Sequence, residues 1–451
     1  MSISSGILGT DSIKSLLIKQ AVPASIGILF MSLNILVDTI FVGQWIGSLA
    51  IAAVTVVLPI TFLISSLGMA IGIGGSSIIS RALGANDKQK AVQTFGNQLM
   101  MTLSLALFFV IVGVFFGEEI LLLFGANGAI MAPAATFFYP VLLGVPFLAL
   151  CMMGNTVIRA EGKPKFAMIA MIIPAFGNII LDIVFMKVFN MGMFGAALAT
   201  TISYIMCFSF ILWFFLKKSE LKLQLQDFIF NGKIVKEITS LGMVTFSRQG
   251  VVSILSIILN HTLYTYGGEH SVAVYGIISR MLMFALFPIL GITQGFLPIA
   301  GFNYGAKNYH RVKETISISI KYAALLAMII FVIILIFAKP IVGIFTTDVD
   351  IINETPAALR WVFAASPIIA IQLIGAAYFQ AAGKAIPALL LTLTKQGFFL
   401  IPLVLILPTY FGIFGVWIAF PISDVLSTII TGYFLKKEMT HKLNEVSDGI
   451  L

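Results

Sequence analysis

Three carboxylic acids lie inside long apolar stretches of this chain, where an ionised side chain is strongly disfavoured: Asp38, Asp182 and Asp424. Two of them repeat one pattern, because Asn34 precedes Asp38 by four residues and Asn178 precedes Asp182 by four. On a helix this spacing places the amide and the carboxylate on one face, one turn apart. A charge inside a membrane span costs at least about 2.5 kcal/mol, so acids are found there mainly where they have a function. The repeated pattern therefore predicts an ion or proton site.

The ligands in this pattern are hard oxygen atoms, which suit a proton or a small hard cation better than a transition metal. Thr200, in the next apolar stretch, is expected at a similar depth and adds a hydroxyl group. The chain has four His, none with a Cys or carboxylate at metal-ligand spacing. We therefore predict no cofactor and a coupling ion that is either H⁺ or Na⁺, the latter held by Asp38, Asn178, Asp182 and Thr200. The alternative is that Asn34 and Asn178 only tie helices together by hydrogen bonds.

The elements that must position these groups are membrane-spanning helices. The chain is 59% hydrophobic and only 10% charged, whereas a soluble protein averages about 25% charged residues. Twelve apolar stretches are each about long enough to cross a bilayer as a helix, which takes roughly 20 residues. They are residues 21–41, 50–79, 95–116, 134–158, 166–186, 192–216, 240–265, 271–300, 315–338, 356–381, 386–410 and 412–435. The sequence predicts an all-α integral membrane protein, with a kink in its first span at Pro23.

The chain contains the same pattern twice. Gly84-Ala85 recurs as Gly305-Ala306, and the segment 159–163 recurs as 380–384, both at an offset of 221 residues. Duplicated halves are typical of secondary transporters. We expect an N-terminal six-helix lobe (1–216), a linker (217–238), a C-terminal six-helix lobe (239–436) and a tail (437–451). The second copy has no acid near Leu259–Asn260 or Ile401–Leu403, where Asp38 and Asp182 would recur. The coupling site is therefore expected in the first lobe alone.

The basic residues predict the orientation. With the N-terminus inside, twenty of the 27 Lys and Arg fall in inside segments, four lie within spans, and only Lys187, Lys339 and Arg360 fall outside. Positive charge stays on the cytoplasmic side, so both termini are expected there. The net charge of +8 then reflects topology and anionic headgroups rather than nucleic acid. Arg81 and Arg159, in short inside loops, are expected to be structural.

The second copy has ionisable groups of its own within spans. Asp424 follows Pro421, and Arg248, Arg280 and Lys395 also lie within apolar stretches. Two alternatives stay open for Asp424: an ion pair with Lys395 or Arg280, or a position facing a cavity. We take Arg280, Met281 and Asp424 as candidates for a substrate cleft, since flexible thioethers suit a promiscuous apolar cavity.

Several segments together resemble the multidrug and toxic compound extrusion (MATE) family, in its DNA-damage-inducible-type prokaryotic branch, over essentially the whole chain. The segments are Val37-Asp38, Ser80–Ala85, Gly154–Pro164, Asn178–Asp182 and Gly195–Thr200. The resemblance implies two six-helix bundles arranged in a V around a central cleft. It also implies a cation site at Asp38, Asn178, Asp182 and Thr200, with Asn155 as a further member.

The function implied by this resemblance is antiport, in which amphipathic and often cationic compounds leave the cell in exchange for H⁺ or Na⁺. Partners would be small molecules and the lipid bilayer of the inner membrane, with no nucleic acid, and the chain would be a monomer. The alternative is a flippase for lipid-linked precursors from the same superfamily. An ion channel would place polar residues in rings along a pore, and an enzyme would need a nucleophile–base constellation that the sequence does not offer.

Overall fold

A computed structural model describes residues 6–443, which are mostly helical and contain no strand. The helices form two compact units. The first unit contains Ile26–Thr245, and the second contains Gly9–Ser25 together with the chain from Phe246 onward. Two helices, α2 (Ile13–Trp45) and α9 (Gly232–Gly305), therefore begin in one unit and end in the other.

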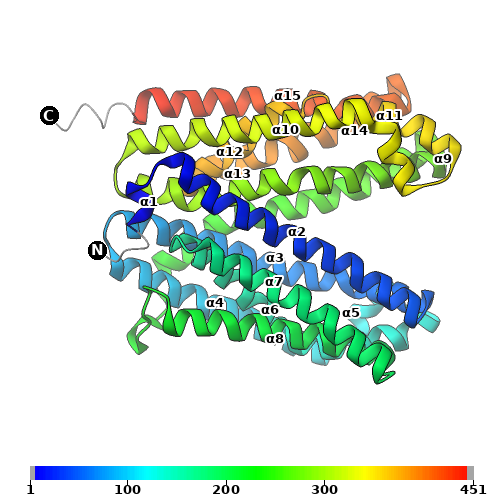
Figure 1. The fold of residues 1–451 in the computed structure, drawn as a ribbon, viewed down its shortest axis with the longest axis horizontal. Helices are drawn as coiled ribbons and strands as arrows, with labels where there is room; N and C mark the ends of the chain where they lie inside the picture. The colour runs from blue at the N-terminus through cyan, green and yellow to red at the C-terminus, as the bar shows by residue number, and fades with distance from the viewer. Residues whose placement is uncertain (1–5, 444–451) are drawn as a thin grey trace. The chain divides into compact units, whose positions relative to one another are not determined.

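The helices of the first unit run along one common direction, coloured blue to green in Figure 1. Besides the later part of α2 and the first turns of α9, they are α3 (Ser48–Gly84), α4 (Lys88–Phe115), α5 (Gly117–Leu123), α6 (Met131–Ala160), α7 (Pro164–Asp182) and α8 (Gly192–Lys217). A π-helical segment, η2 (Ile183–Val188), continues α7 without a break. Short helical turns are α1 (Ile7–Thr10), η1 (Gly128–Ile130) and η3 (Leu225–Asp227).

The second unit repeats this order with more interruptions. Its helices are the later part of α9, α10 (Tyr309–Phe345), α11 (Val349–Phe363), α12 (Ile369–Ala381), α13 (Ala385–Leu393), α14 (Ile401–Phe411) and α15 (Ile413–Lys437). A 3₁₀ turn, η4 (Ser366–Ile368), joins α11 to α12. The π-helical segment η5 (Thr394–Leu400) joins α13 to α14, and a second one, η6 (Glu438–Lys442), extends α15.

The prediction of an all-α chain with twelve membrane spans is confirmed. Within residues 6–443, eleven helices are long and apolar enough to cross a membrane. One of them, α9, has 74 residues, or about 110 Å of helix, more than three times the hydrocarbon thickness. Its backbone leaves the helical region at Gly268, where φ is 63° and ψ is −165°. Glycine adopts this conformation without strain, and it divides α9 into two spans.

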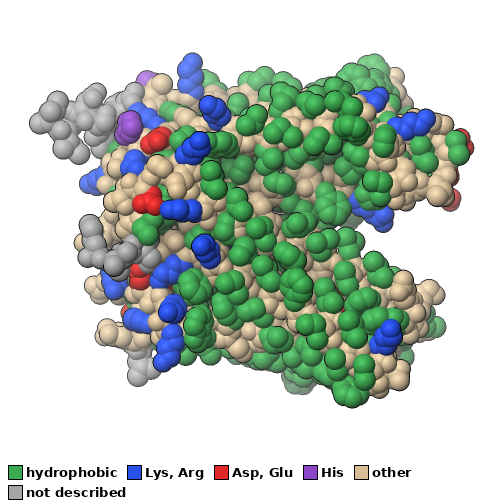
Figure 2. Space-filling model, in the orientation of Figure 1, with side chains coloured by type: hydrophobic (Ala, Val, Ile, Leu, Met, Phe, Trp, Pro, Cys, Tyr) green, Lys and Arg blue, Asp and Glu red, His purple; other side chains and the backbone are tan. Residues whose placement is uncertain are grey.

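Each unit has its own apolar core. Val57 and Phe137 belong to the core of the first unit, and Leu259 and Leu359 to that of the second. Large hydrophobic side chains also remain on the surface, such as Leu123, which is 82% exposed. Figure 2 shows hydrophobic side chains over much of the visible face of each unit. An apolar surface of this extent is what lipid tails require of a spanning protein.

Glycines bring the first turns of α9 against α3 inside the first unit. A Cβ atom at Gly74 would lie 2.3 Å from the carbonyl oxygen of Ile238. A Cβ atom at Gly242 would lie 2.7 Å from the carbonyl oxygen of Ala70. The two backbones therefore approach more closely than any larger residue would permit, as small-residue contacts do between membrane helices.

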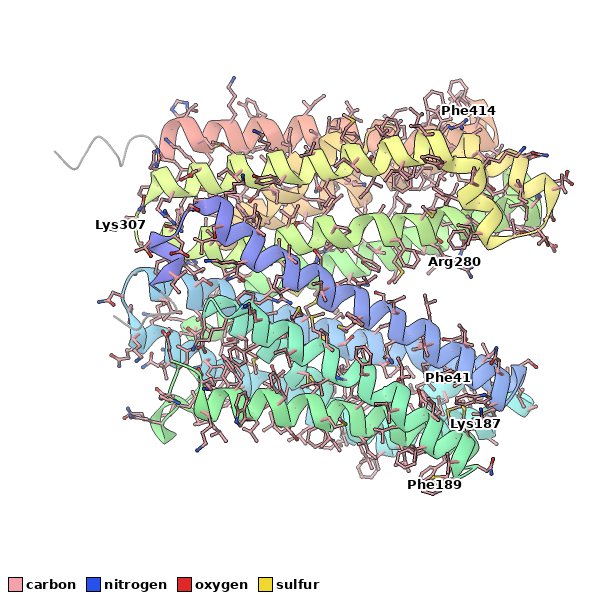
Figure 3. The ribbon with its side chains drawn as sticks, in the orientation of Figure 1. Phe41, Lys187, Phe189, Arg280, Lys307 and Phe414 are labelled. Atoms are coloured by element: carbon pink, nitrogen blue, oxygen red, sulfur yellow. The ribbon has the colours of Figure 1, made fainter. Side chains whose placement is uncertain are left out.

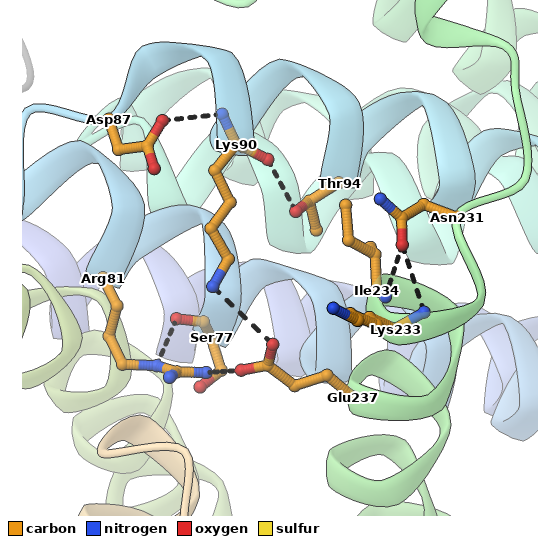
Figure 4. A network of polar contacts seen from close by, with 9 residues as sticks. All are labelled: Ser77, Arg81, Asp87, Lys90, Thr94, Asn231, Lys233, Ile234 and Glu237. Carbon is orange, nitrogen blue, oxygen red and sulfur yellow. Dashed lines mark hydrogen bonds and ion pairs between the residues drawn. The ribbon is translucent and has the colours of Figure 1, made fainter.

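An ion-pair network fixes the same two helices at their ends (Figure 4). The guanidinium of Arg81, in the last turn of α3, donates to Glu237 of α9 at 2.8 Å. Lys90 of α4 lies 3.8 Å from the other oxygen of Glu237. Arg81 thus has a structural contact, in accordance with its predicted role.

The predicted linker, residues 217–238, covers η3 and the first turns of α9. The predicted boundaries of the two lobes and of the tail stay predictions. Residues 444–451 of the tail lie outside the described residues.

Candidate functional site

The first unit holds α2 and α7 side by side in a fixed parallel register. Asn34 Nδ2 donates to Asn178 Oδ1 at 2.8 Å, across a sequence separation of 144 residues. The same separation relates Gly27 to Met171, whose sulfur would lie 2.6 Å from a Cβ atom at the glycine. Since each helix advances about 1.5 Å per residue, this register predicts which residue pair must meet one turn further on.

That pair is Asp38 and Asp182. Their carboxyl groups interact with each other, Asp38 from a half-buried position and Asp182 from a fully buried one. Among the described residues, one buried oxygen of each carboxyl group has no hydrogen-bond partner. Asn178 Nδ2 donates to Asp182 Oδ1 over a long 3.5 Å. Two interacting carboxylates with unused oxygen atoms can take up a proton or a small cation, and either would offset their mutual repulsion.

Helix α8 supplies the third wall of this site. Cys207 Sγ lies 3.1 Å from the carbonyl oxygen of Ala170, and a Cβ atom at Gly195 would lie 3.1 Å from the carbonyl oxygen of Phe185. These two contacts set an antiparallel register between α7 and α8. The register places Thr200 at the level of Asn178.

The Thr200 hydroxyl donates to the Ala196 carbonyl at 3.0 Å. Its oxygen keeps lone pairs that can accept a hydrogen bond or bind a cation.

Tyr204 also belongs to this site, although its sequence context did not predict it. Its phenol interacts electrostatically with Asp38. It follows Thr200 by four residues, so both side chains lie on one face of α8. The four-residue spacing from Thr200 could have indicated that Tyr204 faces the site. A tyrosine in an apolar stretch, however, often only fills space between helices.

The helix changes its winding directly after the second acid. Helix α7 ends at Asp182 and continues as the π-helical segment η2. A π-turn inserts an extra residue per turn and is frequent at functional sites. Lys187 of η2 lies 5.6 Å from the ring centroid of Trp45, which stacks on Phe41 at 4.2 Å. Figure 3 labels Phe41 on α2 and Lys187 on η2.

Asn155 lies elsewhere in the first unit. Its Nδ2 donates to the Ala167 carbonyl at 2.6 Å, and its Oδ1 accepts from Arg159 Nε at 3.0 Å. Ala167 is fifteen residues from Asp182 on α7, a distance of about 22 Å along the helix. The structure therefore joins Asn155 to Arg159 rather than to the carboxyl pair.

Arg159 is 4% exposed, and its Nη1 has no hydrogen-bond partner within the described part of the chain. A second buried ionisable residue, Glu161, lies in the loop directly after α6. Its carboxylate accepts from the Ser219 hydroxyl at 2.5 Å and from the Glu220 amide at 3.0 Å, with Lys163 Nζ at 3.5 Å. Burial raises the pKa of Glu161 above its ordinary value, while these hydrogen bonds act in the opposite direction.

Two of the ionisable residues within spans of the second unit form an ion pair. Lys395 Nζ, in η5, lies 2.8 Å from Asp424 of α15. The ion pair with Lys395, one of the alternatives left open by the sequence, is therefore what the structure contains. Arg280 lies exposed on the later part of α9 (Figure 3), next to the half-buried Met281. Within residues 6–443 no three His, Cys, Asp or Glu side chains gather to bind a metal ion.

The fold and this site define the class of protein: a multi-pass membrane transporter built from two repeats, with paired acids inside one repeat. Comparison with known proteins identifies the family. The MatE family model matches residues 23–184 and again residues 246–406. The chain belongs to the MATE family. Its members are transporters and not enzymes, and the family resemblance predicted from the sequence is confirmed.

Two similar proteins align with nearly the whole length of this chain. The multidrug export protein MepA of Staphylococcus aureus (strain MSSA476) is 27% identical over 433 residues, which are 95% of each chain. MepA of Staphylococcus saprophyticus is 28% identical over 435 residues, again 95% of each chain.

Two solved structures give the same result at the level of the fold. A crystal structure of a MATE protein in the bent conformation superposes with a TM-score of 0.93 at 27% identity. The superposition covers 99% of this chain and 100% of the other chain. An outward-facing multidrug resistance MATE transporter of the MOP superfamily gives a TM-score of 0.92 at 26% identity, with 99% of both chains covered.

Proposed function

We propose that this protein exports amphipathic, often cationic, organic compounds by antiport with H⁺ or Na⁺. The observation that carries the proposal is the interacting pair Asp38 and Asp182, each with a buried oxygen that lacks a partner among the described residues. Multidrug export by the MepA relatives supports the class of substrate.

The carboxyl pair would serve as the coupling site. Binding a proton or a cation removes the repulsion between the two carboxylates and changes how α2 and α7 pack against each other. Pro23 removes one backbone hydrogen bond from α2, so the helix can bend there at low energy. The bend would alter the drug-binding surface of the first unit. Drug and coupling ion would then favour different conformations, as antiport requires.

The ligand set fits either ion. A proton needs only the pair, since one carboxyl group can donate to the other once it is protonated. Na⁺ would need further oxygen ligands, which Asn178 and Thr200 would supply from the same level of α7 and α8. Asn34 would act indirectly, because its amide holds Asn178 in position.

We place the chain in the inner membrane as a monomer with both termini in the cytoplasm. Arg280, Met281 and Asp424 are proposed to contribute to substrate binding rather than to coupling. Their replacement is then expected to change the substrate range or affinity.

Transport in proteoliposomes tests this function. The purified protein takes up a fluorescent cationic dye under an imposed pH gradient or an imposed Na⁺ gradient, and the gradient that drives uptake identifies the ion. Asp38→Asn and Asp182→Asn should each abolish gradient-driven transport at normal expression. Asp350→Asn, which removes an exposed acid at the start of α11, is the matched control. Full transport by both site variants would refute the mechanism.

A further inference from the structure

Three consecutive large hydrophobic side chains are exposed outside the spans, in the loop between α8 and α9. Phe228, Ile229 and Phe230, here called the apolar triplet, are 39%, 67% and 58% exposed. The triplet lies between η3 and the first turn of α9, and polar residues flank it on both sides, Asp227 and Asn231. A contiguous apolar patch on the surface marks a place where an apolar partner binds.

The loop holds the triplet in a fixed position against α4. Asn97, which is 1% exposed, donates from Nδ2 to the Ile229 carbonyl at 3.3 Å and accepts from the Asn231 amide at 2.9 Å. A Cβ atom at Gly96 would lie 2.2 Å from the Asp227 carbonyl oxygen. Figure 4 shows the next contact, in which Asn231 accepts from two amides in the first turn of α9. Backbone contacts on both sides of the triplet therefore keep its side chains exposed.

The triplet lies at the level where α4 changes from charged to apolar. Gly96 and Asn97 are at the start of the apolar stretch 95–116, about 13 Å along the helix from its first residue, Lys88. Lys88 and Lys90 precede this level, and apolar residues follow it. Such a change along a membrane helix marks the boundary between water and hydrocarbon. The triplet is thus at the height where headgroups meet acyl chains.

The charged side chains around the triplet form a positive surface. All five lysines of residues 217–238 are exposed: Lys217, Lys218, Lys222, Lys233 and Lys236. None of this segment's three acids, which all lie within the described residues, is exposed: Asp227 is buried, and Glu220 and Glu237 are half-buried. Glu237 also pairs with Arg81 at 2.8 Å. The exposed charge of the segment is therefore positive and complements an anionic surface.

We propose that residues 217–238 form an interfacial anchor that binds anionic phospholipid. The triplet lies among the upper parts of the acyl chains, and the lysines on both sides of it contact the phosphate groups. Lipid fits this surface better than a protein partner, because α4 enters the bilayer at the same level. The anchor does not depend on the coupling proposed for Asp38 and Asp182. The linker thus has a binding role besides connecting the two repeats.

Quenching of a fluorophore by brominated lipids tests the anchor. The full chain carries Cys151→Ala and Cys207→Ala, and a bimane label is attached to Phe230→Cys in phosphatidylcholine vesicles. The matched control carries the label on Ala85→Cys, which is exposed in the loop between α3 and α4 of the same unit. Acyl chains brominated near the headgroup should quench the label at Phe230→Cys and leave the control unquenched. If Phe230→Cys does not fold, Ile229→Cys takes its place. Quenching no stronger than at Ala85→Cys would overturn the inference and favour a soluble partner.

The choice of headgroup tests the role of charge. Brominated phosphatidylglycerol should quench the label at Phe230→Cys at about one fifth of the mole fraction that brominated phosphatidylcholine needs, which is the effect of one lysine near an anionic surface. Lys222→Gln combined with Lys233→Gln should remove most of this preference. Lys339→Gln, which replaces an exposed lysine of α10 in the second unit, should leave it unchanged. Equal quenching by the two lipids, or a preference undiminished in the double variant, would overturn the inference.

Discussion

The bond between Asn34 and Asn178 is the contact that fixes the register of the acid pair. It connects α2 to α7 at 2.8 Å, one turn before the two carboxyl groups meet. A one-residue change in the register of either helix would turn Asp38 or Asp182 by about 100° and separate them. The amides therefore contribute to the site even if they never contact the ion.

A double-mutant cycle measures this contact. Asn34→Leu and Asn178→Leu each leave the other amide without its partner, whereas the double variant removes both. The coupling energy should be about 0.6 kcal/mol and at most about 1.7 kcal/mol, the range known for hydrogen bonds between membrane helices. Thermal unfolding of the purified variants in detergent provides the measurement. Strictly additive effects would show that the two amides do not act together.

Glu161 predicts a pH dependence of stability. Burial raises its pKa in the folded chain above the ordinary value of 4.5. The folded state therefore holds this proton more tightly than the unfolded state, and stability is lost as the pH rises above about 4.5. Glu161→Gln keeps an acceptor for Ser219 but removes the titration. The unfolding midpoint of the variant should rise relative to the wild type as the pH increases. A difference that stays constant with pH would contradict this assignment.

At the scale of elements, close backbone contacts determine where α9 packs. Gly74 and Gly242 let α3 and α9 approach until carbonyl oxygens occupy the space of a side chain. Because the neighbouring atoms belong to backbone, they cannot rotate away from a substituent. The glycines therefore tolerate less change than most exposed positions on the same helices.

Gly74→Ala should destabilise the protein by about 1–3 kcal/mol through overpacking. The matched control is Gly250→Ala on α9, where an added Cβ atom meets no atom of the described residues within 4 Å. Because alanine is the better helix former, the control should be neutral or stabilising by up to about 1 kcal/mol. The midpoints of thermal unfolding in detergent compare the two. Equal midpoints would refute the packing argument.

Much of the fold and part of the site could be predicted from the sequence, for reasons that differ between elements. Each long apolar stretch must be a helix, since no other open structure satisfies its backbone in lipid. The acid pair was visible because Asn34–Asp38 and Asn178–Asp182 share one spacing. Tyr204 was not, because only its electrostatic interaction with Asp38 distinguishes it from other aromatic residues in apolar stretches.

Asn155 was predicted as a further member of the cation site, and its observed contacts are with Ala167 and Arg159. Sequence spacing shows which side chains share a helix face, but not which neighbouring helix that face meets. Asn155 lies beside Ala167, about 22 Å along α7 from Asp182, and this level depends on how α6 packs against α7.

At the scale of the whole molecule, the orientation predicted from the basic residues can be tested directly. Lys88 at the start of α4 and Phe189 after η2 are both exposed and lie at opposite ends of their helices. A membrane-impermeant thiol reagent should label Phe189→Cys in intact cells and Lys88→Cys only after permeabilisation, in a chain without Cys151 and Cys207. Labelling of Lys88→Cys in intact cells would reverse the orientation.

The loop after α6 and the corresponding loop after α12 each contact a segment at the end of their own repeat. The buried acid lies in the loop in the first repeat and in the terminal segment in the second. In the first repeat Glu161 is in the loop and accepts from Ser219 beyond α8. In the second the loop supplies Lys384, and the acid is Glu438 beyond α15. Each loop therefore depends on a different residue in the distant segment of its own repeat. A chimera that grafts one loop into the other repeat would inherit an incompatible partner, so protein engineers must transplant the loop and its distant terminal segment together.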